Sequence, residues 1–214
     1  MNFICNDINY SLNTSADYSG IWSKKTKKLK INNYSISLSK YPCTMNINGL
    51  AVYSIASELG LDPSSIISQI ETFKMPDGRG QIKKINKYLV IDDTYNSNME
   101  SMQYGIKNLI EYPSTNRKVV VIGDMLELGE NEEQYHKNIA KSLNHENISA
   151  IFAFGKLTRY TIKNISNQHI HKEFYKDKKK LIHDLKQFLN EDDIIYIKGS
   201  RSMKMEEIIM ELNK

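Results

Sequence analysis

The sequence predicts an α/β fold in which a mostly parallel sheet is flanked by helices. From residue 88 onwards, short apolar segments alternate with segments whose apolar residues recur at helical spacing. Two of the apolar segments, VVVIG at 119–123 and IIYIKG at 194–199, are almost continuously apolar, as expected for strands covered on both faces. Polar residues gather where these segments end. This alternation is typical of a Rossmann-like arrangement.

Length and composition limit the other classes. The chain has 214 residues, of which 40% are hydrophobic, enough for one domain with a sizeable core plus a smaller piece. Its two cysteines, Cys5 and Cys43, show no CxxC or Cys/His spacing, which predicts reduced thiols and neither a disulfide framework nor a zinc site. No signal-peptide pattern and no run near the roughly 20 apolar residues of a membrane span is present, so we expect a cytoplasmic protein. The net charge of +4 is spread along the chain and requires no nucleic-acid partner.

The first part of the chain reads as a small mixed α+β piece. Short alternating segments at Asn2–Cys5, Asp17–Ile21 and Leu29–Leu38 predict antiparallel strands. A helix is expected over Asn48–Leu59, stopped by Gly60. Asp62 and Pro63 then predict the N-cap and first turn of a second helix that runs to about Phe73.

A linker separates this piece from the rest. Residues 76–80 contain one proline and two glycines, where neither helix nor strand persists. We therefore predict three parts: residues 1–76, a linker at 77–81, and the α/β domain at 82–214. In that domain we expect strands at 88–93, 118–123, 150–155, 173–175 and 193–198, and helices at about 99–111, 132–143, 157–165, 178–189 and 203–212.

The candidate site residues follow three of these strands. Asp92 and Asp93 end the first, Asp124 follows the second, and Ser200 and Arg201 follow the last. In a doubly wound sheet such loops converge on one crevice, where ligands bind. A helix N-terminus after Ser200 favours an anion, and Arg201 suits a carboxylate or phosphate. The alternative is that these residues only form turns and helix caps.

Other motifs carry less information. Arg79 lies between two glycines, which suits approach to a phosphate or ribose, although an exposed hinge arginine is the alternative. The five histidines form no HxxxH pair and are interpreted as surface or structural residues. GxSxG, GxxxxGK[ST] and GxGxxG are all absent, so the chain has no nucleophile elbow, no P-loop and no dinucleotide fingerprint.

Four segments in this order resemble the Mur ligases: GRG at 78–80, IDDTYNSN at 91–98, IGDMLELGE at 122–130 and KGSRSMKME at 198–206. The nearest type adds D-Ala-D-Ala to UDP-N-acetylmuramoyl-tripeptide. LNTSADYSGIW at 12–22 and NGLAVYSIASELG at 48–60 resemble the end of that family's central ATPase domain. The resemblance implies that residues 1–76 are a C-terminal remnant of the ATPase domain, and that 82–214 are the family's Rossmann-like C-terminal domain. It also implies part of an ATP-dependent amide-bond ligase of peptidoglycan precursor synthesis.

The resemblance assigns roles to individual residues. Arg79 and Asp93 would bind the nucleotide, and Tyr95 and Asn96 would face the nucleotide or the reacting centre as catalytic residues. The dipeptide pocket would be lined by Asp124, Ser200 and Arg201. ATP and Mg²⁺ are implied as cofactors, but the P-loop and magnesium ligands are not in this chain, and we predict no metal ligands of its own. The adenine-binding His-Asn pair of the family is replaced by Thr44 and Met45.

Three functional hypotheses remain open from the sequence, as does the alternative of a degenerate, non-functional remnant. In the first, the chain is part of a ligase that works only when a separate chain supplies the P-loop and UDP-sugar domains. In the second, it is a non-catalytic binding or regulatory domain that retains the nucleotide or dipeptide crevice. In the third, Asp92, Asp93, Asp124 and Lys198 form the acidic cluster and lysine of a receiver-like phosphoacceptor domain.

Overall fold

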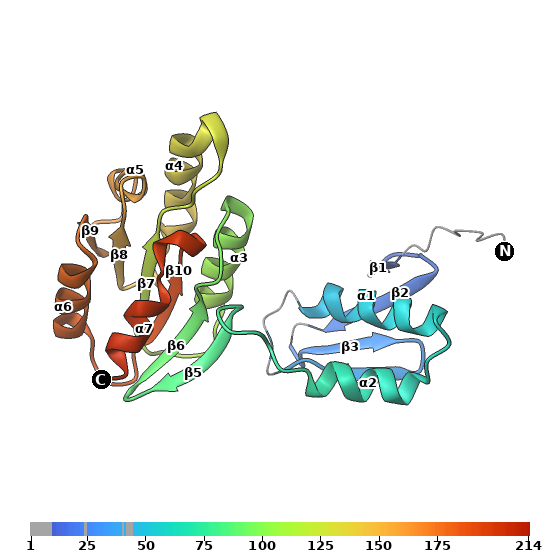
Figure 1. The fold of residues 1–214 in the computed structure, drawn as a ribbon. Coiled ribbons are helices and arrows are strands. Elements are labelled where there is room, and N and C mark those ends of the chain that lie inside the picture. The colour runs from blue at the N-terminus through green and yellow to red at the C-terminus, as the bar shows by residue number, and fades with distance from the viewer. Residues whose placement is uncertain (1–9, 24, 40, 42–44) are drawn as a thin grey trace. The chain divides into compact units, whose positions relative to one another are not determined.

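The computed structural model describes residues 10–23, 25–39, 41 and 45–214. The chain divides into two compact units, Met1–Lys74 and Met75–Lys214 (Figure 1). The predicted strand at Asn2–Cys5, both cysteines and Thr44 lie outside the described residues. The predicted linker at 77–81 falls at the start of the second unit, a few residues after the division.

The first unit is a four-stranded sheet with two helices. Its strands are β1 (Tyr10–Leu12), β2 (Tyr18–Ser23), β3 (Lys28–Ile31) and β4 (Tyr34–Ser37), in that order across the sheet. The prediction that Leu29–Leu38 is one strand was wrong: Asn32, with φ +52°, turns the segment into a hairpin. The antiparallel pairing holds for β2, β3 and β4, but β1 pairs with β2 in parallel.

The two helices of this unit match their predicted signals. Helix α1 spans Met45–Glu58, three residues longer at its start than predicted, and Gly60 follows it with φ +77°. Helix α2 spans Pro63–Thr72 and is capped by Asp62, whose carboxylate accepts the Ser65 N–H at 2.9 Å. The side chains buried within this unit include Leu29, Ile31, Ile36, Leu38, Leu50, Ile66 and Ile70.

The second unit contains the predicted sheet. Its six strands lie in the order β5-β6-β10-β7-β8-β9, and every pair is parallel except β5 with β6. The strands are β5 (Gln81–Ile85), β6 (Tyr88–Asp93), β7 (Lys118–Gly123), β8 (Ala150–Phe154), β9 (His171–Tyr175) and β10 (Ile194–Lys198). The predicted α/β fold with a mostly parallel, Rossmann-like sheet is confirmed. The antiparallel edge strand β5 was not predicted.

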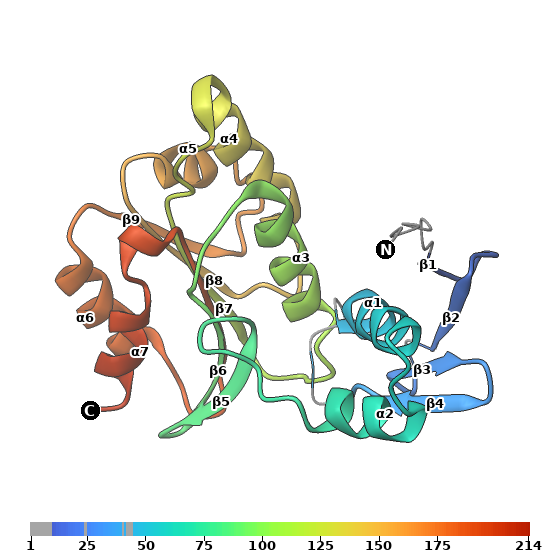
Figure 2. The same cartoon turned by 45° about the vertical axis from the view of Figure 1, so that its right-hand side comes forward.

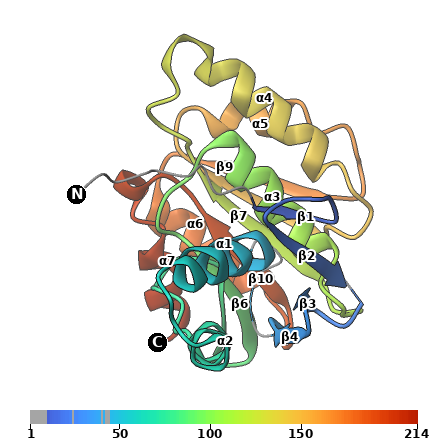
Figure 3. The same ribbon diagram turned by 90° about the vertical axis from the view of Figure 1, so that its right-hand side faces the viewer.

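Helices cover both faces of this sheet (Figures 2 and 3). They are α3 (Met99–Ile110), α4 (Glu132–Leu143), α5 (Thr158–Lys163), α6 (Lys178–Phe188) and α7 (Glu206–Leu212). Helices α3, α4 and α5 share one apolar core, and α6 and α7 share the other. Helix α7 begins three residues later than predicted, because Lys204 adopts φ +47° between a 3-10 turn at Arg201–Met203 and the helix. No helix in the described part of the chain is long and apolar enough to cross a membrane.

Strand register brings the candidate residues together. Strand β10 lies between β6 and β7, and Lys198 pairs in register with Asp93 on one side and Ile122 on the other. Because side chains alternate along a strand, Asp93, Tyr196 and Lys198 share the face covered by α3, and Asp92 points to the other face. The carboxyl ends of β6, β10 and β7 therefore meet at one edge of the sheet.

Candidate functional site at the carboxyl ends of the strands

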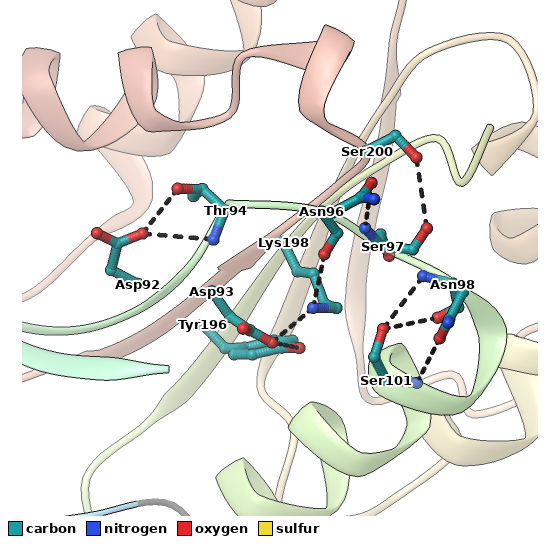
Figure 4. A network of polar contacts seen from close by, with 10 residues as sticks. All are labelled: Asp92, Asp93, Thr94, Asn96, Ser97, Asn98, Ser101, Tyr196, Lys198 and Ser200. Atoms are coloured by element: carbon teal, nitrogen blue, oxygen red, sulfur yellow. Dashed lines mark hydrogen bonds and ion pairs between the residues drawn. The ribbon is translucent and has the colours of Figure 1, made fainter. Parts of the chain in front are cut away.

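An ion pair lies at the centre of this edge (Figure 4). The Lys198 Nζ atom is 2.7 Å from Asp93 Oδ2 and also donates to the Asn96 carbonyl at 2.9 Å. Lys198 is only 3% exposed and the Asp93 side chain 20%. The Tyr196 hydroxyl donates to the same Asp93 oxygen at 3.0 Å. Three elements of the second unit, β6, β10 and the loop after β6, are thus held together by one carboxylate and one ammonium.

Burial sets the protonation of this network. Burial raises the pKa of the Asp93 carboxyl above its usual value, although the charge and hydrogen bond of Lys198 and the hydrogen bond of Tyr196 act in the opposite direction. Burial, followed by the neighbouring Asp93 charge, raises the pKa of the Tyr196 phenol well above its usual value. The phenol therefore remains protonated and donates.

The adjacent Asp92 belongs to a different set of contacts. Its Oδ1 atom accepts from the Thr94 hydroxyl at 2.8 Å, and its Oδ2 atom pairs with Lys83 of β5 at 2.8 Å. Asp92 is buried and both of its oxygens have partners. The two acids thus face opposite sides of the sheet, and they do not form one acidic cluster.

The loop after β6 is built from local hydrogen bonds. The Asn96 side chain accepts the Ser97 N–H at 2.9 Å. Asn98 caps α3: its side chain accepts the Ser101 N–H at 2.8 Å, and the Ser101 hydroxyl accepts the Asn98 N–H at 3.1 Å. Tyr95 and Asn96 remain exposed on this rigid loop. Both residues predicted to be catalytic are therefore accessible to solvent.

Backbone contacts attach the Gly-Arg-Gly segment to the same loop. The Tyr95 N–H donates to the Gly78 carbonyl at 3.0 Å, and the Gly80 N–H donates to the Asp92 carbonyl at 2.7 Å. Gly78 has φ +73°, and a Cβ atom there would lie 2.8 Å from the Tyr95 nitrogen, so a side chain at this position would be strained. Next to this glycine, the Arg79 guanidinium stacks on the Tyr95 ring, with its Cζ atom 3.8 Å from the ring centroid.

Asp124 lies at the end of β7 and is buried. Its carboxylate accepts three backbone N–H groups at the start of α5, from Lys156 at 2.7 Å, Leu157 at 2.9 Å and Thr158 at 2.8 Å. Gly155 allows this approach, because a Cβ atom there would lie 2.3 Å from the Asp124 Cγ atom. Both oxygens of Asp124 therefore bind the protein's own backbone.

Ser200 joins the loops that follow β10 and β7. Its hydroxyl accepts the Leu126 N–H at 2.8 Å, and its own N–H donates to the Asp124 carbonyl at 3.0 Å. Arg201 is 64% exposed, and its Nη1 atom lies 3.1 Å from Glu206 Oε1. The structure thus places Ser200 inside the loop framework and leaves the Arg201 guanidinium accessible to solvent.

His136 of α4 supports the loop after β7, a connection that the sequence did not predict. It is buried, its Nε2 atom accepts the Met125 N–H at 3.0 Å, and its Nδ1 atom lies 2.7 Å from the Glu132 carbonyl. These partners require the neutral tautomer with hydrogen on Nδ1. The interpretation of the histidines as surface or structural residues is thus supported for His136, but no spacing signal could have indicated its partner.

Two groups at this edge of the sheet are candidates for contact with a ligand. An exposed guanidinium at Arg79 suits phosphates, and the structure shows no partner within the described residues for Asp93 Oδ1. No group of three or more His, Cys, Asp or Glu side chains in the described part of the chain is placed to hold a metal. The receiver-like hypothesis is therefore contradicted, because Asp92, Asp93 and Asp124 have separate partners.

Comparison with known proteins agrees with this geometry. A family model described as "Mur ligase, glutamate ligase domain" matches residues 78–201, more than half of the chain. The chain belongs to the Mur ligase family. The matched region contains the Arg79–Tyr95 stack, the Asp93–Lys198 pair, Asp124 and Ser200. Membership of the family does not by itself assign an activity to this chain.

Two curated Mur ligases show the extent of the similarity. Both are UDP-N-acetylmuramoyl-tripeptide–D-alanyl-D-alanine ligases. The one from Buchnera aphidicola of Acyrthosiphon pisum is 31% identical over 239 residues, which cover 95% of this chain and 51% of that protein. The one from Bacillus subtilis is 30% identical over 170 residues, covering 78% of this chain and 37% of that protein. The chain thus spans about half the length, or less, of these relatives.

Solved Mur ligase structures share the fold. A MurF structure from Acinetobacter baumannii superposes with a TM-score of 0.79 at 20% identity and covers 94% of this chain and 46% of that one. The MurF ligase from Thermotoga maritima, solved in complex with ADP, gives a TM-score of 0.71 at 24% identity, covering 93% of this chain and 46% of that one. At these identities the structures establish the fold only.

Proposed function

We propose that this chain is the C-terminal part of an ATP-dependent amide-bond ligase that adds D-Ala-D-Ala to UDP-N-acetylmuramoyl-tripeptide. The observation that carries the proposal is the cluster at the carboxyl ends of β6 and β10, where the Arg79–Tyr95 stack adjoins the Asp93–Lys198 pair within the region matched to the Mur ligases. The curated relatives carry the name of that activity. Residues 1–76 would be the end of the ATPase domain, 77–81 the linker, and 82–214 the C-terminal domain.

Arg79 and Asp93 are proposed to bind the nucleotide. The Tyr95 ring fixes the plane of the Arg79 guanidinium, which keeps a fork of donors ordered for phosphate oxygens. Asp93 is anchored through Oδ2, so Oδ1 is left to accept from ribose hydroxyls. Tyr95 and Asn96 lie on the same loop, and their exposed side chains would face the nucleotide or the reacting centre.

Arg201 is proposed to bind the dipeptide carboxylate, because it is an accessible cation after β10 whose ion pair with Glu206 leaves the guanidinium 64% exposed. Ser200 would shape the pocket by holding the loop after β7. Asp124 would act in the same way, through the first turn of α5, since both of its oxygens are already used. These roles make the site a rigid frame with a few accessible groups, as positioning chemistry requires.

ATP and Mg²⁺ would complete the reaction with residues supplied by a P-loop domain, whether in a longer form of this protein or in a separate chain. When bound, the nucleotide would provide the phosphoryl group that activates the peptide carboxylate for attack by the incoming amine. The residues described above would bind and orient the two reactants. A domain that only binds nucleotide or dipeptide, through the exposed side chains of Arg79 and Arg201, is the second candidate.

Calorimetric titration of the purified chain tests these alternatives. We expect D-Ala-D-Ala to bind the wild-type chain, and binding to fall at least tenfold in Arg201→Ala. Lys186→Ala is the control, because Lys186 is also an exposed cation but lies in the last turn of α6. ATP·Mg²⁺ is titrated separately, with Arg79→Ala as the variant. Dipeptide affinity that survives in Arg201→Ala would contradict the assignment of the carboxylate site.

A further inference from the structure

We propose that Tyr196 is a positioning residue for the nucleotide site: its hydroxyl, seated against Gly105 of α3, fixes the Asp93 carboxylate through Oδ2 and so presents Oδ1 to the nucleotide. The identity of the ligand rests on the proposed function, whereas the hydrogen-bonded arrangement does not. The site residues predicted from the sequence include neither Tyr196 nor Gly105.

Tyr196 is an unusual residue for its position. It lies in the middle of β10, in register with Ile91 of β6 and Val120 of β7, and is only 1% exposed. Its neighbours along the strand, Ile195 and Ile197, are aliphatic. A phenol at the centre of a parallel sheet must satisfy its hydroxyl, because an unpaired buried polar group destabilises the fold. The hydroxyl is satisfied by Asp93 Oδ2 at 3.0 Å.

Gly105 makes room for this ring. A Cβ atom at position 105 would lie 1.7 Å from the Tyr196 hydroxyl oxygen and 2.3 Å from its Cζ atom. Glycine in the interior of a helix such as α3 costs about 1 kcal/mol relative to alanine. The close approach of the Tyr196 ring gives a physical reason for glycine at this position. The close packing of the Tyr196 ring against Gly105 of α3 therefore determines the position of the hydroxyl relative to Asp93.

Two donors at one oxygen restrict the Asp93 carboxylate. Lys198 Nζ and the Tyr196 hydroxyl both contact Oδ2, at 2.7 and 3.0 Å, from neighbouring positions on the same face of β10. The structure shows no hydrogen bond to Oδ1 within the part of the chain that it describes, and the side chain is 20% exposed. Lys198 alone would leave the carboxylate free to swing about its donor. With Tyr196 as well, Oδ2 is anchored by two donors and Oδ1 remains available as an acceptor.

The charges around Asp93 predict how the network responds to pH. Two groups of β10, Lys198 and Tyr196, contact its carboxyl, and Asp92 on the opposite face of the sheet adds a like charge nearby. Hydrogen bonds from Lys198 and Tyr196 favour the carboxylate, whereas burial and Asp92 disfavour it. Removing only the Tyr196 hydroxyl should therefore raise the pKa of Asp93. The side chain would then be charged over a narrower pH range.

The experiment is a ¹³C-detected titration of the Asp93 carboxyl in the full chain without ligand. In Tyr196→Phe, which keeps the ring and removes the hydroxyl, we expect the pKa of Asp93 to rise above that in the wild-type chain. The matched control is Tyr88→Phe, because Tyr88 is also a buried tyrosine of this sheet but faces the other core. An unchanged pKa of Asp93 in Tyr196→Phe would overturn the proposal.

A second variant keeps the hydroxyl and moves it. Gly105→Ala should displace the Tyr196 ring and raise the pKa of Asp93 in the same direction. Gly49→Ala in α1 is the matched control, since the nearest atom to a Cβ there is 3.7 Å away. If Gly105→Ala does not fold, Tyr196→Phe still decides the result, because it removes one oxygen atom and adds no volume.

Nucleotide binding is then measured by titrating ATP·Mg²⁺ into the same proteins at several pH values. We expect Tyr196→Phe to bind about three- to tenfold more weakly, with the loss greatest near the raised pKa of Asp93. Equal affinity in wild type and Tyr196→Phe, together with a raised pKa, would overturn the positioning role. If the pKa of Asp93 is higher in Tyr196→Phe than in the wild-type chain, but the wild-type chain does not bind ATP, the proposed nucleotide function is contradicted and the positioning of Asp93 is not.

Discussion

Asp93 and Asp124 end two strands that flank β10, yet they use their carboxylates in opposite ways. Asp124 binds three backbone N–H groups of one helix start with both oxygens. Asp93 binds two side chains through one oxygen, and the structure shows no bond to the other among the described residues. Asp124 therefore holds the framework in place. The Asp93 carboxylate is anchored at Oδ2, and we propose that Oδ1 accepts from a ligand.

Asp93 and Asp124 are both acidic residues at the carboxyl end of a strand, and the sequence alone does not distinguish their roles. Both follow an apolar strand, and both were assigned to the site by the Mur ligase resemblance. Only the partners distinguish them, and those partners lie 32 to 34 residues away for Asp124 and 103 to 105 residues away for Asp93. The predictions that follow test this distinction, from the largest expected effect to the smallest.

Asp124→Ala should be the most destabilising change. It leaves three buried N–H groups at the start of α5 without their charged acceptor, and we expect a loss of about 4 kcal/mol in the free energy of unfolding of the second unit. Hydrogen exchange of the α5 amides measures it. The sole tryptophan, Trp22, lies in the first unit, so its fluorescence reports on the part that should not change.

Asp177→Ala is the control for Asp124→Ala. Asp177 also caps a helix, but it is exposed, and it accepts one backbone N–H among the described residues, that of Lys179 at 2.8 Å. We expect a loss of about 1 kcal/mol there. Equal losses in the two variants would show that Asp124 is an ordinary cap.

Lys198→Met should be next in size. It leaves Asp93 partly buried without its counter-ion, and we expect a loss of about 3 kcal/mol at pH 8. Without Lys198 the pKa of Asp93 rises further above its unfolded value, so the carboxyl is more easily neutralised in the folded state. The loss should shrink as the pH falls below that raised pKa and should be greatest above it.

Urea unfolding of Lys198→Met at pH 5 and pH 8 checks this dependence. Lys178→Met is the control, because Lys178 pairs with the more exposed Glu207 on the outer face of the unit. We expect that variant to lose less stability. A loss in Lys198→Met that does not depend on pH would contradict the role given to the Asp93 charge.

Ser200→Ala should have a smaller and more local effect. It removes the acceptor of the Leu126 N–H, and we expect a loss of about 1 kcal/mol and faster hydrogen exchange at that amide. Ser202→Ala is the control, since Ser202 is exposed in the same segment. Unchanged exchange at Leu126 would remove Ser200 from the loop framework.

Tyr95→Leu should have the smallest effect on stability. The Arg79–Tyr95 stack is exposed, and its loss changes the free energy of unfolding by about 0.5 kcal/mol. ATP·Mg²⁺ affinity should nevertheless fall several-fold, because Arg79 loses its ordered orientation. Tyr104→Leu, an exposed tyrosine of α3, is the control for both measurements. A variant that unfolds readily would show that the stack is structural.

The sequence predicted the second unit well because its signals are local. Strands β6 and β7 and helix α4 begin and end where they were expected, at turn formers that interrupt apolar runs. Strand β5 was missed because it is a half-exposed edge strand with little apolar character. Its signal was the turn at Asn86, which adopts φ +52° and reverses the chain into β6.

The sequence predicted the candidate site only in part. The strand-end rule indicated which loops meet, but it did not distinguish the contacts of Asp92, Asp93 and Asp124. Those contacts depend on which face of the sheet each side chain occupies and on residues far along the chain. Tyr196 gave no signal at all, because a tyrosine within an apolar strand is read as core.

The central claim is that Asp93 faces the ligand and Asp124 holds the framework. The most direct test is an NMR titration of the ¹⁵N-labelled full chain with ATP·Mg²⁺. We predict saturable shifts of the backbone amides of Arg79 and residues 93–97. The amides of residues 156–158, which are bound to Asp124, should stay where they are. Shifts centred on residues 156–158, or no saturable shift at residues 93–97, would contradict this assignment.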